Sequence, residues 1–145
     1  MYKHLLIATD GSELAQRALL QGCELAKALG SKLTIITVTE PWRMTAPAEV
    51  AVVYPIEEYE IAAAENAKQI LADASHIATI AGVSPDTIHV KDEFPAEGIV
   101  QTAQAQGCDL IVMASHGYRG LMELVLGSQA QRVVTMGHTS VLICR

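Results

Sequence analysis

The sequence contains few cysteines and few basic residues, and these shortages exclude several classes of protein. Its three cysteines, Cys23, Cys108 and Cys144, are odd in number and widely spaced. They predict buried thiols, and they indicate neither a disulfide framework nor a CxxC metal or redox pair. Ten Lys and Arg residues against sixteen Asp and Glu residues give a net charge of −6. Because nonspecific nucleic-acid binding needs a basic face, we expect no nucleic-acid partner.

Long apolar segments are also missing. The apolar runs end well short of the roughly 18 to 20 residues that a membrane span needs, and the start of the chain, Met1-Tyr2-Lys3-His4, lacks the apolar stretch of a signal peptide. We therefore expect a cytoplasmic protein with no membrane partner. Half of the 145 residues are hydrophobic, which is enough to bury a core, so one domain is expected over residues 1–145.

Two familiar phosphate-binding signatures are absent as well. No GxxxxGK[ST] segment occurs, and no GxGxxG segment follows the first predicted strand. Their absence argues against a P-loop enzyme and against a standard dinucleotide-dependent enzyme. Any anionic ligand is therefore expected to be held by backbone amides and helix ends, against an unfavourable net charge.

What the sequence does contain is an alternation of β-rich apolar runs with helical segments. The runs at 3–8 and 110–114 are nearly all apolar, as in central parallel strands buried on both faces, whereas 87–91 alternates like an edge strand. The segment 40–55 carries three prolines and no clean period, so it predicts an irregular loop. Strands are predicted at 3–8, 32–38, 87–91, 110–114 and 141–144, and helices at 13–29, 56–81, 95–106 and 129–136.

The predicted helices have recognisable end signals. Ser12 is suited to cap the first helix and Gly30 to end it, and Pro95 is suited to be the first residue of another helix. Ser128 and Gln131 match the Ser-x-x-Gln capping box at the start of the last one. Strands joined by helices predict an open, doubly wound α/β sheet with right-handed crossovers. Such sheets bind ligands at the carboxyl ends of the strands, where the strand order reverses.

The most informative segment follows the second apolar strand. It reads Ala114-Ser115-His116-Gly117, then nine residues, then Gly127-Ser128 at a predicted helix start. Gly117 would let the backbone approach a phosphate, while Gly127 and Ser128 would present free amides at the positive end of a helix. The alternative is that these glycines only shape a loop and that Ser128 is an ordinary helix cap.

Three further side chains have two interpretations each. Asp10 follows the first central strand and so flanks the same crevice as Ala114, but it also suits a turn or cap before the first helix. His116 can contact a phosphate or remain solvated in the loop. Arg119 can reach across a bound anion or point into solvent.

The chain resembles the universal stress protein family from end to end. Within that family, an ATP-binding branch has the pattern Gly-x2-Gly-x9-Gly-Ser/Thr, and Gly117, Gly127 and Ser128 match its last three positions. Ala114 stands where the branch usually has the first glycine, and we expect alanine to be tolerated there with an altered affinity. The segments that carry the resemblance are Ile7-Ala8-Thr9-Asp10-Gly11-Ser12, Thr37-Val38, residues 111–117 and Ser140-Val141-Leu142-Ile143.

The resemblance implies a Rossmann-like, adenine nucleotide hydrolase-like fold with strand order 3-2-1-4-5, and a site for ATP, ADP or AMP that can include Mg²⁺. It also implies a homodimer formed through the last strand, Ser140–Cys144. The adenine side would be formed by Asp10 and the Val38 backbone, the ribose side by Ala8, Met113 and Ala114, and the phosphate cradle by Gly117, Gly127, Ser128 and Gln129.

Three functions are compatible with this pattern. The first is a nucleotide-responsive binding protein of stress physiology, without dedicated catalysis. The second is an interaction module of the same fold that binds no nucleotide, an interpretation supported mainly by Ala114. The third is a slow ATP hydrolase, which the sequence favours least, since Asp10 is the one obvious carboxylate in the crevice and the resemblance assigns it to the adenine end.

Overall fold

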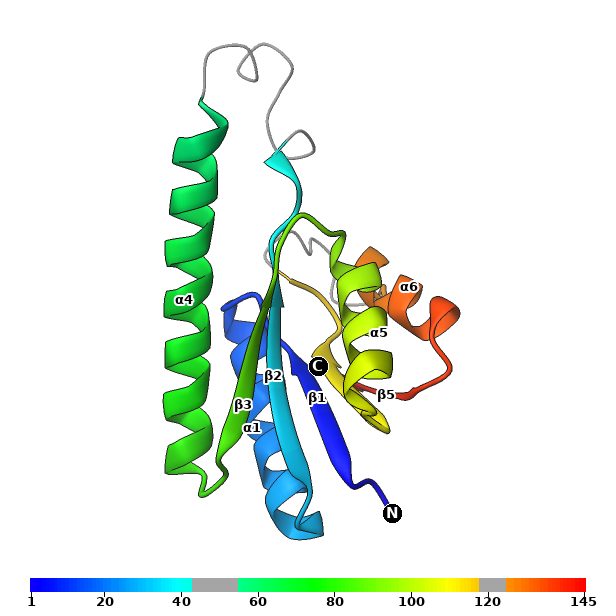
Figure 1. The fold of residues 1–145 in the computed structure, drawn as a ribbon. Coiled ribbons are helices and arrows are strands. Elements are labelled where there is room, and N and C mark those ends of the chain that lie inside the picture. Colours follow the sequence, from blue (N-terminus) through cyan, green and yellow to red (C-terminus); the bar gives the residue numbers. More distant parts are fainter. Residues whose placement is uncertain (43–54, 118–124) are drawn as a thin grey trace.

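The computed structural model describes residues 1–42, 55–117 and 125–145, and within them the strands form one parallel sheet (Figure 1). The sheet has the order β3-β2-β1-β4-β5, and all neighbouring strands are parallel. This confirms the predicted α/β class and strand order. The strands are β1 (His4–Ala8), β2 (Lys32–Val38), β3 (Pro85–Val90), β4 (Leu110–Ala114) and β5 (Ser140–Cys144).

Helices connect these strands and cover both faces of the sheet. The described helices are α1 (Glu13–Leu29), α4 (Ile56–Ile80), α5 (Pro95–Gln106) and α6 (Ser128–Met136). Helices α1 and α4 pack on one face, and α5 and α6 pack on the other (Figure 1). The sheet is therefore doubly wound, as the alternation of strand and helix signals predicts.

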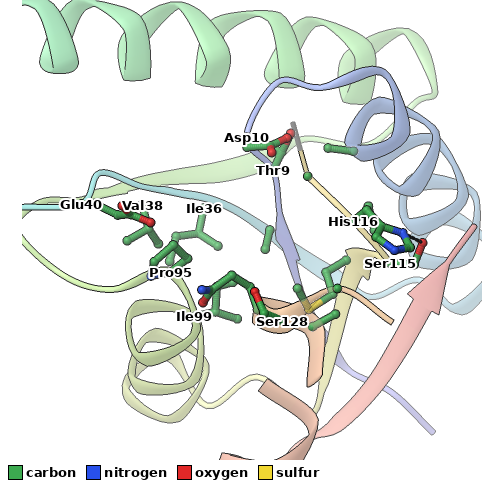
Figure 2. A pocket seen from close by; sticks show the side chains of 18 of the residues that line it. Thr9, Asp10, Ile36, Val38, Glu40, Pro95, Ile99, Ser115, His116 and Ser128 are labelled. Carbon is green, nitrogen blue, oxygen red and sulfur yellow. Dashed lines mark hydrogen bonds between the residues drawn. The ribbon is translucent and has the colours of Figure 1, made fainter. Parts of the chain in front are cut away.

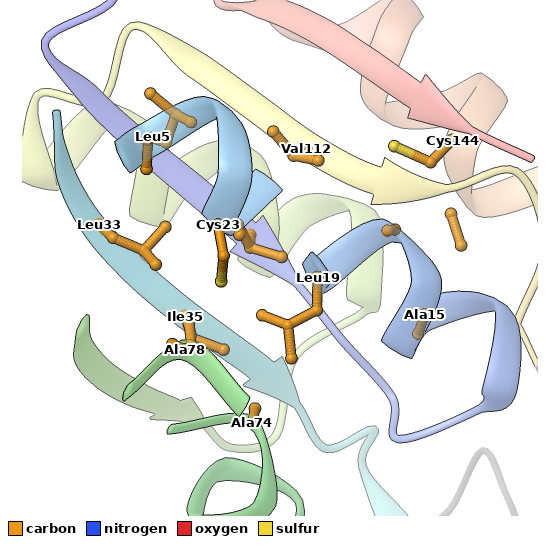
Figure 3. Packing of buried hydrophobic residues seen from close by; sticks show 14 of the residues in the cluster. Leu5, Ala15, Leu19, Cys23, Leu33, Ile35, Ala74, Ala78, Val112 and Cys144 are labelled. Carbon is orange, nitrogen blue, oxygen red and sulfur yellow. The ribbon is translucent and has the colours of Figure 1, made fainter. Parts of the chain in front are cut away.

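The central strand β1 contributes to the hydrophobic cores on both faces. Leu5 and Ile7 belong to the cluster beneath α1 and α4, which Figure 3 shows in close-up, whereas Leu6 belongs to the cluster beneath α5 and α6. All three side chains are fully buried. Because successive strand residues point to opposite faces, burial of both faces requires the continuous apolar run seen in the sequence.

The predicted ends of α1 are confirmed. Ser12 is the N-cap residue, and its Oγ accepts a hydrogen bond from the Ala15 N–H at 3.2 Å. Gly30 ends the helix with φ of 65°, a left-handed conformation that glycine adopts without a steric penalty. Most of the irregular segment predicted at 40–55, and also Arg119, lie outside the described residues.

The predicted capping box at the start of α6 is wrong. The N-cap residue is Gly127, whose N–H donates to the Ser115 carbonyl at 2.8 Å, and no side chain caps this helix. Gly127 has φ of −59° and ψ of 151°. An N-cap residue must be non-helical; since Gly127 takes that conformation, Ser128 is already the first helical residue and its hydroxyl does not act as a cap.

The expectation of buried thiols is confirmed. Cys23, Cys108 and Cys144 are all free and buried. Burial raises the pKa of the Cys23 thiol to about 11, and burial is also the main reason that the pKa of Cys108 is raised to about 11. Within the described part of the chain, no helix is both long and apolar enough to cross a membrane.

Candidate functional site

A cavity of about 480 Å³ opens at the carboxyl ends of β1, β2 and β4. Strand β1 lies between β2 and β4, so the chain winds outward from this position in both directions. This is the switch point at which a doubly wound sheet leaves a crevice between its connections. Every residue that the sequence predicted for the site lines the cavity: Ala8, Asp10, Val38, Met113, Ala114, Gly117, Gly127, Ser128 and Gln129.

The turn between β1 and α1 forms one wall. Asp10 Oδ1 accepts a hydrogen bond from the Ser12 N–H at 2.9 Å, and Thr9 Oγ1 accepts one from the Gly11 N–H at 3.2 Å. Asp10 thus has the turn-forming role that was one of its two interpretations. It also lines the cavity, so the two interpretations are compatible.

Gly117 also lines the cavity and lies against this turn. A Cβ atom at position 117 would overlap Asp10 Oδ2. Gly117 is not among the glycines with positive φ. A side chain at position 117 would therefore displace the Asp10 carboxylate, whereas the backbone conformation does not itself favour glycine.

Gly127 joins the loop after β4 to the start of α6. A Cβ atom there would lie 2.5 Å from the Ser115 carbonyl oxygen and 3.4 Å from His116 Cα. Both neighbours are backbone atoms, which cannot turn aside as a flexible side chain can. The hydrogen bond from the Gly127 N–H to the Ser115 carbonyl holds the N-terminus of α6 against residues 115–116, at the edge of the cavity.

The N-terminus of α6 is the part of the cavity best suited to an anion. Ser128, Gln129 and Ala130 are its first three residues, and all three line the cavity. The N–H groups of a first helical turn have no partner within the helix, and they carry the positive end of the helix dipole. Because no side chain caps this helix, an anionic group in the cavity would be a suitable acceptor.

The Gln129 side chain has a different partner. Its Oε1 accepts a hydrogen bond from the Ala96 N–H at 3.2 Å, in the first turn of α5. This bond ties the starts of α5 and α6 together across the cavity wall. The contribution of Gln129 to an anion site would therefore come from its backbone amide.

His116 lies beside the same helix start. Its Nδ1 is 3.0 Å from Ser115 Oγ, and the Ser115 N–H donates to the Cys144 carbonyl at 2.8 Å. Both residues line the cavity, with His116 half-buried and Ser115 buried. The loop after β4 is thus fixed to β5 on one side and to α6 on the other.

The side of the cavity next to β2 is lined mainly by apolar side chains, with Glu40 beside Val38. Figure 2 shows Ile36, Val38 and Pro95 together at the left of the cavity, and His116 and Ser115 at the right. Ala8 and Met113 also line the cavity. The cavity therefore has one end suited to a flat, weakly polar group and another suited to an anion.

Ala114 fits this site without backbone strain. It is the last residue of β4, and it is not among the residues with positive φ. Its methyl group belongs to the buried cluster that contains Ala15 and Val112. The extra methyl group, relative to a glycine, is thus packed in the core under α1.

The cavity lining also includes residues that the sequence analysis did not assign to the site, among them Glu40 and Tyr59. The Tyr59 hydroxyl, from the first turns of α4, donates to the Glu40 carbonyl at 2.9 Å. The described lining residues include the carboxylates of Asp10 and Glu40 and no Lys or Arg. The electrostatic attraction that they offer to an anion comes from the backbone amides of α6.

These features define a class of protein: an open, doubly wound α/β fold with an amide-rich, uncapped helix start at its switch point. The chain belongs to the universal stress protein family, whose model matches residues 1–145. A relative of known name is universal stress protein YxiE of Bacillus subtilis (strain 168), which is 33% identical over all of this chain and all of its own.

Solved structures agree with this assignment. That of MJ0577, a universal stress protein of Methanocaldococcus jannaschii, superposes with a TM-score of 0.82 at 29% identity and covers 99% of this chain and 96% of its own. A universal stress protein solved in complex with cAMP superposes with a TM-score of 0.70 at 26% identity, covering 99% of this chain and 97% of its own.

Proposed function

We propose that this protein binds an adenine nucleotide in the cavity at the carboxyl ends of β1 and β4 and acts as a regulatory protein of the stress response. The observation that supports this most is that the uncapped N-terminus of α6 lines a cavity that also has an apolar side next to β2. A nucleotide has the matching division into an anionic end and a flat base. The related protein in complex with cAMP supports the same ligand class.

In this proposal each end of the cavity holds one part of ATP, ADP or AMP. Val38 and Asp10 contact the base, and Ala8, Met113 and Ala114 line the ribose side. The phosphates meet the backbone of Gly117 and of the start of α6, at Gly127, Ser128 and Gln129. The cavity volume of about 480 Å³ lies within the range of about 300–1,000 Å³ typical of small-molecule sites.

Rapid ATP hydrolysis is not part of this proposal. Phosphoryl transfer needs a carboxylate that holds a metal ion and a residue that positions the attacking water near the terminal phosphate. Asp10 Oδ1 is already bonded to the Ser12 N–H, and Glu40 lies at the apolar end. We propose that occupancy of the site, and the surface that the protein then presents to partners, carries the regulatory signal.

We also propose a homodimer that pairs β5 with its copy. Strand β5 is at the edge of the sheet, where backbone groups on the outer side are available for pairing. Leu142 on this strand is 38% exposed, and Val134 and Met136 of the adjacent helix α6 are also exposed. Sedimentation at micromolar concentration should give the mass of a dimer, and a monomer alone would contradict this.

The ligand is best tested by denaturing freshly purified protein, identifying released nucleotides by mass spectrometry, and titrating nucleotide-free protein with ATP. We expect adenine nucleotide from the wild type and none from Gly127→Leu. The matched control is Gly30→Ala. It adds a side chain to a residue with left-handed φ, which strains the backbone, and no atom lies within 4 Å of the added Cβ. Gly30 does not line the cavity. A wild type that releases no nucleotide and takes up no ATP would favour the interaction module that binds none.

A further inference from the structure

Tyr59 is the one Phe, Tyr or Trp side chain among the described residues that line the cavity. It is the fourth residue of α4, on the helix that connects β2 to β3. The residue is half-buried. It therefore adds an aromatic residue to the cavity lining from an element that carries none of the motif residues.

The ring is held in place by its hydroxyl group. The Tyr59 hydroxyl donates to the Glu40 carbonyl at 2.9 Å, and Glu40 is two residues beyond Val38. Glu40 and Val38 lie next to each other at the apolar end of the cavity (Figure 2). The hydrogen bond thus anchors Tyr59 to the end of β2, on the side where the base is proposed to lie.

The cavity that Tyr59 lines also suits a flat apolar ligand. Ile36, Val38 and Ile99 add aliphatic side chains to the cavity lining. Aliphatic side chains accept many shapes, whereas an aromatic ring favours stacking with another planar π-system. With its hydroxyl already hydrogen-bonded, the ring can offer this surface without leaving a buried polar group unpaired.

We propose that Tyr59 is a specificity-determining residue that contacts the base of the bound nucleotide, with its hydroxyl bond to Glu40 positioning the ring. This inference rests on the proposed nucleotide-binding function. It adds a residue from α4 to a site otherwise formed by the ends of the strands and the start of α6. It also makes α4 an element whose contacts change when the base is bound.

The test compares a nucleotide with a ligand that has phosphates and no base. Affinities for ATP are measured by titration calorimetry, and those for inorganic tripolyphosphate by competition with ATP. The variants are Tyr59→Leu, which removes the ring, and Tyr59→Phe, which keeps the ring and removes the hydroxyl. Ile61→Ala is the matched control, because Ile61 is on the same helix, is 70% exposed and does not line the cavity.

We expect Tyr59→Leu to weaken ATP binding roughly tenfold and to leave tripolyphosphate binding unchanged, as for the loss of one base–aromatic stack. Tyr59→Phe should lose less affinity for ATP than Tyr59→Leu does. Ile61→Ala should bind ATP as tightly as the wild type. ATP binding by Tyr59→Leu within twofold of the wild type would overturn the inference. Equal losses for ATP and tripolyphosphate would overturn it too, because they would indicate a general structural effect.

The two proposals fail in different ways. A wild type that binds neither ATP nor tripolyphosphate would refute the nucleotide site as a whole, and the role of Tyr59 with it. A wild type that binds ATP, together with a Tyr59→Leu variant that binds ATP equally well, would leave the nucleotide site in place and refute the role of Tyr59 alone.

Discussion

Gly117 lies so close to Asp10 that a side-chain carbon at position 117 would overlap the carboxylate oxygen Oδ2. The loop after β4 and the turn after β1 therefore meet across the mouth of the cavity. Gly127 makes a comparable contact with the backbone of Ser115. The shape of the site depends on these two close approaches.

The two glycines should respond differently to alanine. Gly127→Ala forces the Ser115 backbone to move, so we expect it to lower the free energy of unfolding by about 1–3 kcal/mol and to weaken ATP binding at least roughly tenfold. Gly117→Ala meets a side chain, which can rotate once its bond to the Ser12 N–H is lost, so its stability loss should be smaller. Urea denaturation and ATP titration measure both effects. A larger stability loss in Gly117→Ala would contradict this account.

Ser12 and Ser128 form a natural pair for testing the helix starts. Ser12 Oγ caps α1, whereas no side chain caps α6. Ser12→Ala should therefore lower the free energy of unfolding by about 1 kcal/mol, and Ser128→Ala should change it little. Equal losses in urea denaturation would mean that Ser128 caps α6 in solution, and that the motif-based prediction was right after all.

The stability of the protein should fall as the pH decreases, through His4. Burial is the main reason that the pKa of His4 is lowered, with a further contribution from the Lys32 charge. The unfolded chain then binds a proton more readily than the folded protein does. The stabilisation is complete above the ordinary His pKa of about 6.5 and is lost as the pH falls through the folded-state value.

The matched variant is His4→Gln, which keeps a polar group near Thr34 Oγ1, the 2.8 Å partner of His4 Nε2. The difference in unfolding free energy between wild type and variant should change between pH 7.5 and pH 5, in the direction of a relatively less stable wild type at low pH. Urea denaturation at several pH values measures it. A constant difference across that range would show that His4 does not titrate differently in the two states.

Magnesium should strengthen the binding of ATP more than that of AMP. The described lining residues include two carboxylates, Asp10 and Glu40, and no Lys or Arg. A triphosphate therefore brings more negative charge than the amides of α6 alone can offset, and Mg²⁺ bound to the phosphates reduces that charge. Calorimetry with Mg²⁺ and with EDTA gives, for each nucleotide, the ratio of the dissociation constants with and without the metal ion. An equal effect on both would count against this charge argument.

The sequence predicts the sheet well because β1 and β4 are buried on both faces, and burial of both faces leaves a plain apolar run in the sequence. It also predicts where the cavity lies, since Ala8 and Ala114 end adjacent strands. The start of α6 was harder to predict. A Ser-x-x-Gln pattern suggests a cap, but the contact of Gly127 with the Ser115 backbone sets the actual N-cap one residue earlier.

Tyr59 and Glu40 could not be placed from the sequence. They are 19 residues apart, and their contact depends on how α4 packs against the sheet, which local patterns do not encode. The one available signal was an aromatic residue near the start of a helix rich in alanine and glutamate. Such a residue more often packs in a core than lines a binding site.

The most direct test of the nucleotide site is a titration of ¹⁵N-labelled protein with ATP and Mg²⁺, followed through the backbone amide signals. The account predicts that the largest shifts occur at Gly127, Ser128, Gln129 and Ala130, with a second group at Val38. Saturating ATP that leaves these signals unchanged, or that shifts only amides far from the cavity, would contradict it.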